Sequence, residues 1–169
     1  SSAHATGRSS TAQTGCNVSV TTPWVIGSSP RMLIHTSTVG ATCAQATATF
    51  LVRDASGKII YQASYRASSV AMTNDATTRV QMQAALINWA GVGRARNSHS
   101  TLPDWMEGAS APEAAEIDFT PVPGVTRAAY LAVKTNRTPL LCYVQDLESL
   151  KCLVLRRGKL EPFGVQSLP

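Results

Sequence analysis

The sequence predicts an α+β fold of mainly antiparallel β-hairpins, about six to seven strands, with one helix packed on the sheet and disulfides as staples. Three observations in the 169 residues predict it. Apolar residues alternate at period two in several short runs, one stretch has helical periodicity, and four cysteines are present. Runs of antiparallel strands with a single helix are typical of α+β proteins rather than of parallel α/β folds.

The first strands are expected at residues 16–22 and 31–38, followed by the clearest hairpin in the sequence. In residues 45–54 the apolar side chains fall on one face, and in residues 58–66 they alternate again. Residues 54–57, Asp-Ala-Ser-Gly, are expected to form the turn, because Gly accepts a positive φ. This pattern predicts a sheet with one core face and one wetter face.

One helix is expected between Asn74, which can cap its first turn, and Gly91, which can close its end. Two neighbouring apolar stripes run along it. The first consists of Ala76, Val80, Ala84 and Ile87, and the second of Met82, Leu86 and Trp89. An apolar arc this wide indicates a helix docked on a sheet.

A long irregular loop is expected over residues 91–118, and β structure returns after it. A strand at residues 127–135 is followed by a second hairpin of residues 140–146 and 150–157, and residues 159–165 form the last strand. A connection as long as residues 91–118 is usually functional or disordered within a compact domain.

The four cysteines predict two disulfides. Cys142 and Cys152 flank the second hairpin and oppose one another if Leu147 is central to its turn, which leaves Cys16 to pair with Cys43. Three pairings are possible in principle, and free thiols or a zinc site are the alternatives. No C-x-x-C motif and no ligand spacing of histidines occurs, so neither a metal nor a cofactor is expected. Disulfides indicate an oxidising compartment.

Residues 1–15 contain no aromatic residue and no aliphatic residue larger than Ala, so they are expected to be a flexible leader before a single domain at 16–169. A removed signal peptide, or a lipid-anchored cysteine before Ser1, would explain such a start and permit the disulfides. An artificial start of the chain is the alternative. No run approaches the roughly 20 apolar residues that a transmembrane helix needs.

The formal net charge of +5 hides two opposed features. Residues 103–118 contain five acids and no base, whereas the rest of the chain has 15 bases and five acids, an excess of ten positive charges. The bases are densest around the last hairpin, at Lys151, Arg156, Arg157 and Lys159. A basic body with an acidic segment predicts either internal pairing of the two or a polarised surface.

Two functional hypotheses follow. The first is an exported, non-enzymatic binding or assembly module, which is periplasmic or secreted, with an outer-membrane lipoprotein as one form of it. Its expected partner is another envelope protein or an anionic surface. The expected binding residues are Arg94, Arg96, Trp105, Arg156, Arg157 and Lys159. A nucleic acid is not the expected partner, because no aromatic ladder accompanies the bases. The alternative is a small hydrolase with a site on residues 94–118, where His99 and Asp104 lie near several serines.

Overall fold

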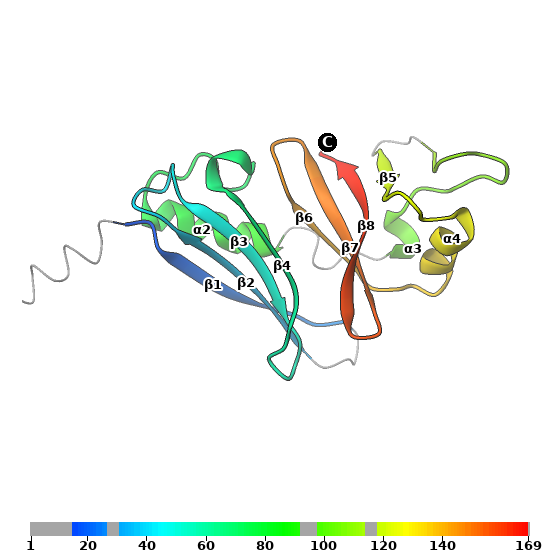
Figure 1. Ribbon diagram of the computed structural model, residues 1–169, viewed down its shortest axis with the longest axis horizontal. Coiled ribbons are helices and arrows are strands. Elements are labelled where there is room, and N and C mark those ends of the chain that lie inside the picture. Colours follow the sequence, from blue (N-terminus) through cyan, green and yellow to red (C-terminus); the bar gives the residue numbers. More distant parts are fainter. Residues whose placement is uncertain (1–14, 27–30, 92–97, 114–117, 169) are drawn as a thin grey trace, which may run out of the picture.

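The computed structural model describes residues 15–26, 31–91, 98–113 and 118–168 (Figure 1). Two four-stranded antiparallel sheets make up the α+β fold, with strand orders β1-β2-β3-β4 and β5-β8-β7-β6. The described residues thus contain eight strands, one more than the upper figure expected from the sequence. The additional strand is β5, which is only three residues long and therefore gives almost no period-two signal.

The first sheet is a meander of four strands that is covered on one face by a helix. Its strands are β1 (Val18–Trp24), β2 (Met32–Val39), β3 (Thr47–Arg53) and β4 (Ile59–Arg66). The short helix η1 (Ala67–Ser69) follows β4, and the helix α2 (Arg79–Gly91) packs on β1 and β2. The hydroxyl of Thr36 on β2 donates a 3.0 Å hydrogen bond to the carbonyl of Leu86 on α2.

Helix α2 begins later than expected, at Arg79 rather than near Asn74. Thr78 caps it, because its hydroxyl accepts from the Gln81 amide at 3.1 Å while the Gln81 side chain accepts from the Thr77 amide at 2.9 Å. Of the two apolar stripes, the one with Trp89 faces the core. Val80 of the other stripe is 78% exposed, so only the second stripe docks on the sheet.

The second sheet contains β5 (Phe119–Pro121), β6 (Leu140–Val144), β7 (Ser149–Arg156) and β8 (Lys159–Ser167). The helices α3 (Ser98–Thr101) and α4 (Arg127–Thr135) pack against one another beside it. The expectation of a strand at residues 127–135 is therefore wrong. The hydroxyl of Thr126 accepts from the Ala129 amide and caps a helix there, and Tyr130 and Val133 share its buried face at helical spacing.

Both disulfides form with the expected pairing, Cys16 with Cys43 and Cys142 with Cys152. Cys142 and Cys152 are direct partners in the β6–β7 ladder, and all four cysteines are buried. The first disulfide connects the start of β1 to the loop between β2 and β3. Disulfides persist in oxidising compartments, so the two bonds indicate an extracytoplasmic protein.

An aromatic cluster joins the two sheets. The Tyr143 ring on β6 stacks on Phe50 of β3 at a centroid distance of 4.3 Å, and Trp89 of α2 meets Tyr143 edge-on. The Tyr143 hydroxyl is hydrogen-bonded to the hydroxyls of Tyr61 at 2.5 Å and Tyr65 at 2.6 Å, both on β4. These contacts fix the second sheet against the first.

Replacing Tyr143 by Phe should therefore cost about 1–3 kcal/mol of unfolding free energy, because two hydroxyls in a half-buried site lose their partner. Urea denaturation measures the change. Tyr61→Phe removes one of the two bonds and should cost less, about 0.5–1.5 kcal/mol. Equal stability of Tyr143→Phe and wild type would show that the hydroxyl cluster does not stabilise the sheet junction.

Candidate functional site

The tips of two hairpins from different sheets lie side by side at one end of the molecule. The β3–β4 turn and the β7–β8 turn point in the same direction (Figure 1). The end of β1 and the start of β2 lie at this end as well, since Trp24 pairs with Met32 and Leu33 pairs with Arg53. The ends of six strands, together with the turns that join β3 to β4 and β7 to β8, thus build one surface, which none of them forms alone.

Six basic residues gather here, and we call this surface the cationic end. They are Arg31, Arg53, Lys58, Arg156, Arg157 and Lys159. All are exposed except Arg53, which is half-buried and donates to the Gly57 carbonyl at 2.8 Å. Arg156 pairs with Glu161 at 3.0 Å. The sequence-predicted residues Arg156, Arg157 and Lys159 therefore belong to a larger basic surface.

A small cleft, the hairpin cleft, opens between the two tips. Its volume is about 430 Å³, within the range of ligand pockets. It is lined by Met32, Asp54, Ala55, Ser56, Ile60, Leu155 and Gly158. Met32, Ile60 and Leu155 make its walls apolar and come from β2, β4 and β7, so the cleft lies between the sheets.

The polar side chains of the cleft are used within the β3–β4 turn. The Asp54 carboxylate accepts hydrogen bonds from the Ser56 hydroxyl at 2.6 Å and from the Lys58 amide at 2.9 Å. The Ser56 hydroxyl first, and then the Lys58 amide, lower the pKa of Asp54 below its usual range. Asp54 is therefore an ionised group that holds the turn together, and the cleft presents mainly hydrocarbon.

The opposite end of the molecule carries most of the acids that lie near strand ends. Asp146 and Glu148 occupy the β6–β7 turn, and Asp118 precedes β5. Asp75 lies four residues after Ala71, whose amide donates a hydrogen bond to the Asp146 carbonyl in that turn. Arg66 and Arg79 lie at this end too. A strand of eight residues such as β7 spans about 25 Å, which exceeds the Debye length of about 8 Å at physiological salt. The two ends are thus electrostatically separate, and the molecule is polarised.

The described residues of the acidic segment, 103–113 and 118, do not meet the cationic end. Asp104 pairs with Lys134 of α4 at 3.1 Å. Trp105 is only 8% exposed: its ring contacts Tyr130 edge-on and its Nε1 donates to the Ala109 carbonyl at 2.8 Å. Trp105 is therefore a packing residue and does not offer the exposed aromatic anchor that the sequence suggested. Arg94 and Arg96 lie outside the described residues.

The candidate hydrolase residues, namely His99, Asp104 and the neighbouring Ser98, all contact helix α4. His99 Nδ1 lies 3.2 Å from the Lys134 carbonyl, and the Ser98 hydroxyl donates to the Val133 carbonyl at 3.2 Å. Asp104 contacts the ammonium group of the same Lys134. These contacts fasten α3 to α4 and do not build the nucleophile–base pair that acyl transfer requires.

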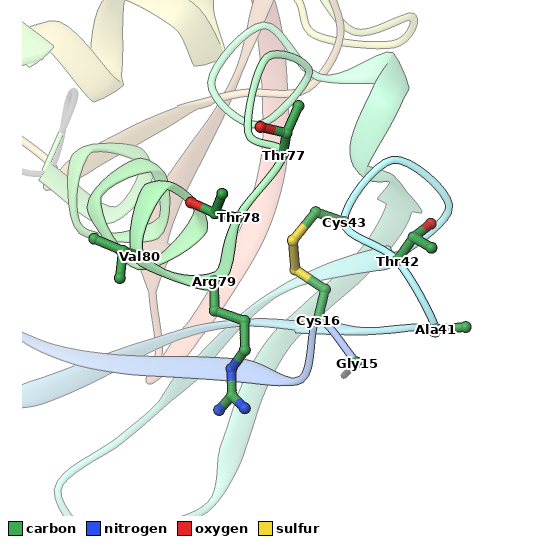
Figure 2. Close-up of a pocket in the computed structure, with 9 residues that line it drawn as sticks. All are labelled: Gly15, Cys16, Ala41, Thr42, Cys43, Thr77, Thr78, Arg79 and Val80. Carbon is green, nitrogen blue, oxygen red and sulfur yellow. A yellow bond between two sulfur atoms is a disulfide. The ribbon is translucent and has the colours of Figure 1, made fainter. Parts of the chain in front are cut away.

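A second pocket lies beside the first disulfide. Figure 2 shows the Cys16–Cys43 bond between the start of β1 and the 41–43 loop, facing the first turn of α2. The pocket has a volume of about 670 Å³. Its Thr77 and Thr78 hydroxyls take part in the helix cap with Gln81, so they already have partners. The pocket therefore lies at a structural junction between the first disulfide and the cap of α2.

Within the described ranges, no cluster of three or more His, Cys, Asp or Glu residues could hold a metal ion. Among the described helices, none has the length and apolar character required to cross a membrane. Comparison of the chain with protein-family models, with curated proteins and with solved structures finds no match. The site must therefore be interpreted from its own chemistry.

His35 is the one titratable side chain in the described part of the chain with a buried, unbonded polar atom, its Nε2. It lies on the outer face of β2, where its Nδ1 contacts the Thr21 hydroxyl at 3.0 Å. Burial first, and the nearby charge of Arg53 second, lower the pKa of His35 below its ordinary value of 6.5. The neutral imidazole is thus favoured in the folded protein.

This shift predicts that stability falls on acidification. The unfolded chain takes up the proton at its higher pKa, so stability is fully present above 6.5 and declines as the pH falls below it. The melting temperature should drop between about pH 7.5 and about pH 5.5, and His35→Gln should show a smaller drop. His99→Gln controls for the loss of an imidazole. An identical drop in wild type and His35→Gln would rule out this linkage.

Proposed function

We propose that the chain is an exported, non-enzymatic binding module that docks an anionic partner of the cell envelope on its cationic end. The single observation that carries the proposal is the gathering of six bases from both sheets around one apolar cleft. Charge that serves only solubility is spread over a surface, whereas a one-sided cluster steers and binds opposite charge. The two disulfides support an extracytoplasmic location.

The position of the N-terminal segment fits this role. Gly15 and Cys16 lie at the start of β1, and β1 runs from there toward the cationic end. A leader formed by residues 1–15, attached to a lipid anchor or to another envelope component, would therefore leave the domain at the end remote from the hairpin tips. Such a tether would present the cationic end away from its point of attachment, in the periplasm or at the cell surface.

Docking by charge predicts a specific loss on charge reversal. Lys58→Glu with Lys159→Glu should elute from immobilised heparin, a soluble model polyanion, at clearly lower salt than wild type. Each reversed base also repels the ligand, so a loss of roughly ten-fold or more in affinity is expected. Heparin chromatography and a binding titration at two salt concentrations measure it.

The matched control is Arg66→Glu with Lys151→Glu, which changes the net charge equally but lies outside the cationic end. This variant should retain most of the affinity. Equal losses in the two variants would mean that only net charge matters, and the proposed docking surface would then be wrong. Thermal melting of both variants excludes loss of the fold as the cause.

A further inference from the structure

We infer that the anionic partner is a lipid surface, and that the hairpin cleft accepts an acyl chain while the bases around it contact the headgroups. This inference rests on the proposed function, because it names the partner of the same cationic end. The proposed ligand is an anionic lipid, and the alternative ligand is an acidic polymer without acyl chains. Three features of the cationic end support the inference: the lining of the cleft, the exposed apolar side chains near it and the positions of the bases.

The lining favours hydrocarbon. Met32, Ile60 and Leu155 form its walls, while Asp54 and Ser56 are hydrogen-bonded within the β3–β4 turn. A peptide entering the cleft would lose water from its backbone amides and find these side chains already engaged, which is unfavourable. A chain of methylene groups needs no hydrogen bond and gains from burial.

Two large apolar side chains project at the same end. Ile59 at the start of β4 is 43% exposed, and Val25 directly after β1 is 57% exposed. Single exposed apolar residues are ordinary on a protein surface. Here Ile59 adjoins the cleft-lining Ile60, and Val25 follows Trp24, whose ladder partner Met32 also lines the cleft, so both lie at the end where side chains could enter the interfacial layer of a bilayer.

The bases occupy the positions that headgroups would reach. Lys58 lies in one turn and Arg157 in the other, and Lys159 and Arg31 lie next to cleft-lining residues Gly158 and Met32. Long Lys and Arg side chains can bury their stems along apolar surface and keep their charged groups among phosphates. Each base near an anionic bilayer strengthens binding by about five-fold, so a cluster of this size suffices for docking.

Vesicle sedimentation tests the inference. Wild-type protein should bind vesicles of phosphatidylcholine with phosphatidylglycerol and should not bind vesicles of phosphatidylcholine alone. Ile59→Ser with Leu155→Ser should weaken vesicle binding by roughly ten-fold, the effect expected for a buried aliphatic side chain, without changing heparin binding. The matched control is Val80→Ser with Ile87→Ser, two exposed apolar positions on α2, which should bind like wild type.

The two proposals fail in different ways. Heparin binding that persists while phosphatidylglycerol vesicles are not bound, or are bound equally by the Ile59/Leu155 variant, overturns the lipid inference and leaves the cationic docking surface intact. Absence of binding to both probes overturns both proposals. If the double variant melts early, Ile59→Ser alone replaces it.

Titrations of wild-type protein with short-chain dihexanoyl-phosphatidylglycerol and with glycerol phosphate then test whether the acyl chains contribute to binding. The lipid should bind at least ten-fold tighter than the headgroup, since several methylene groups are buried. Equal affinity for the two would assign the site to phosphate alone and would overturn the acyl-chain inference.

Discussion

The hydroxyl of Tyr143 is the contact on which the arrangement of this protein depends. Each sheet closes its own hydrogen-bond ladder, and the two sheets share no ladder, so side-chain contacts and a backbone bond from the Ala71 amide to the Asp146 carbonyl hold one half against the other. Tyr143 reaches from β6 to two tyrosines on β4, and burial together with the hydrogen bonds to Tyr61 and Tyr65 raises its pKa, so the group stays neutral. The hairpin cleft lies between β4 and β7, and its shape therefore depends on this junction.

The second disulfide stabilises the same region. Cys142 precedes Tyr143 on β6, and its bond to Cys152 fixes the register of β6 against β7. By restricting the unfolded chain, a bridge that closes so short a loop contributes about 3 kcal/mol or less. In a reducing compartment β6 would lose this cross-link next to the tyrosine that joins the sheets. The oxidising compartment and the alignment of the hairpins are thus physically connected.

Local features of the fold were predictable because their signals are local. Period-two alternation and the turn residues 54–57 predicted the β3–β4 hairpin. The opposed positions of Cys142 and Cys152 predicted the β6–β7 hairpin. The sequence suggested a strand where α4 forms, because Ala128, Tyr130 and Ala132 are apolar at period two; in the helix only Tyr130 of the three is buried, and it shares its face with Val133. Thr126, a good N-cap three residues before Ala129, was the signal that favoured the helix.

The candidate site was predictable only in part, because most of it is tertiary. Arg156, Arg157 and Lys159 are close in sequence and stood out as a basic hairpin. Arg31, Arg53 and Lys58 are scattered along the first third of the chain, and each is an ordinary exposed or half-exposed base when considered alone. Only the packing of β4 beside the second sheet brings the two groups to one end. The cleft has no sequence signal at all, since Met32, Ile60 and Leu155 are typical strand residues.

The charge of the chain can now be interpreted. A net charge of +5 is compatible with acids and bases that neutralise one another across the fold, and such a protein would need no anionic partner. The described residues instead form two ion pairs, Asp104 with Lys134 and Arg156 with Glu161, and both are local to their own region. Asp104 of the acidic segment is held by Lys134 of α4. At the cationic end Asp54 and Glu161 offset part of the positive charge, and Asp146 and Glu148 lie several Debye lengths away at the far end of β7, so those distant acids do not cancel the remaining field of the cationic end. Its counter-charge must come from solvent ions or from a partner, and a partner releases those ions on binding.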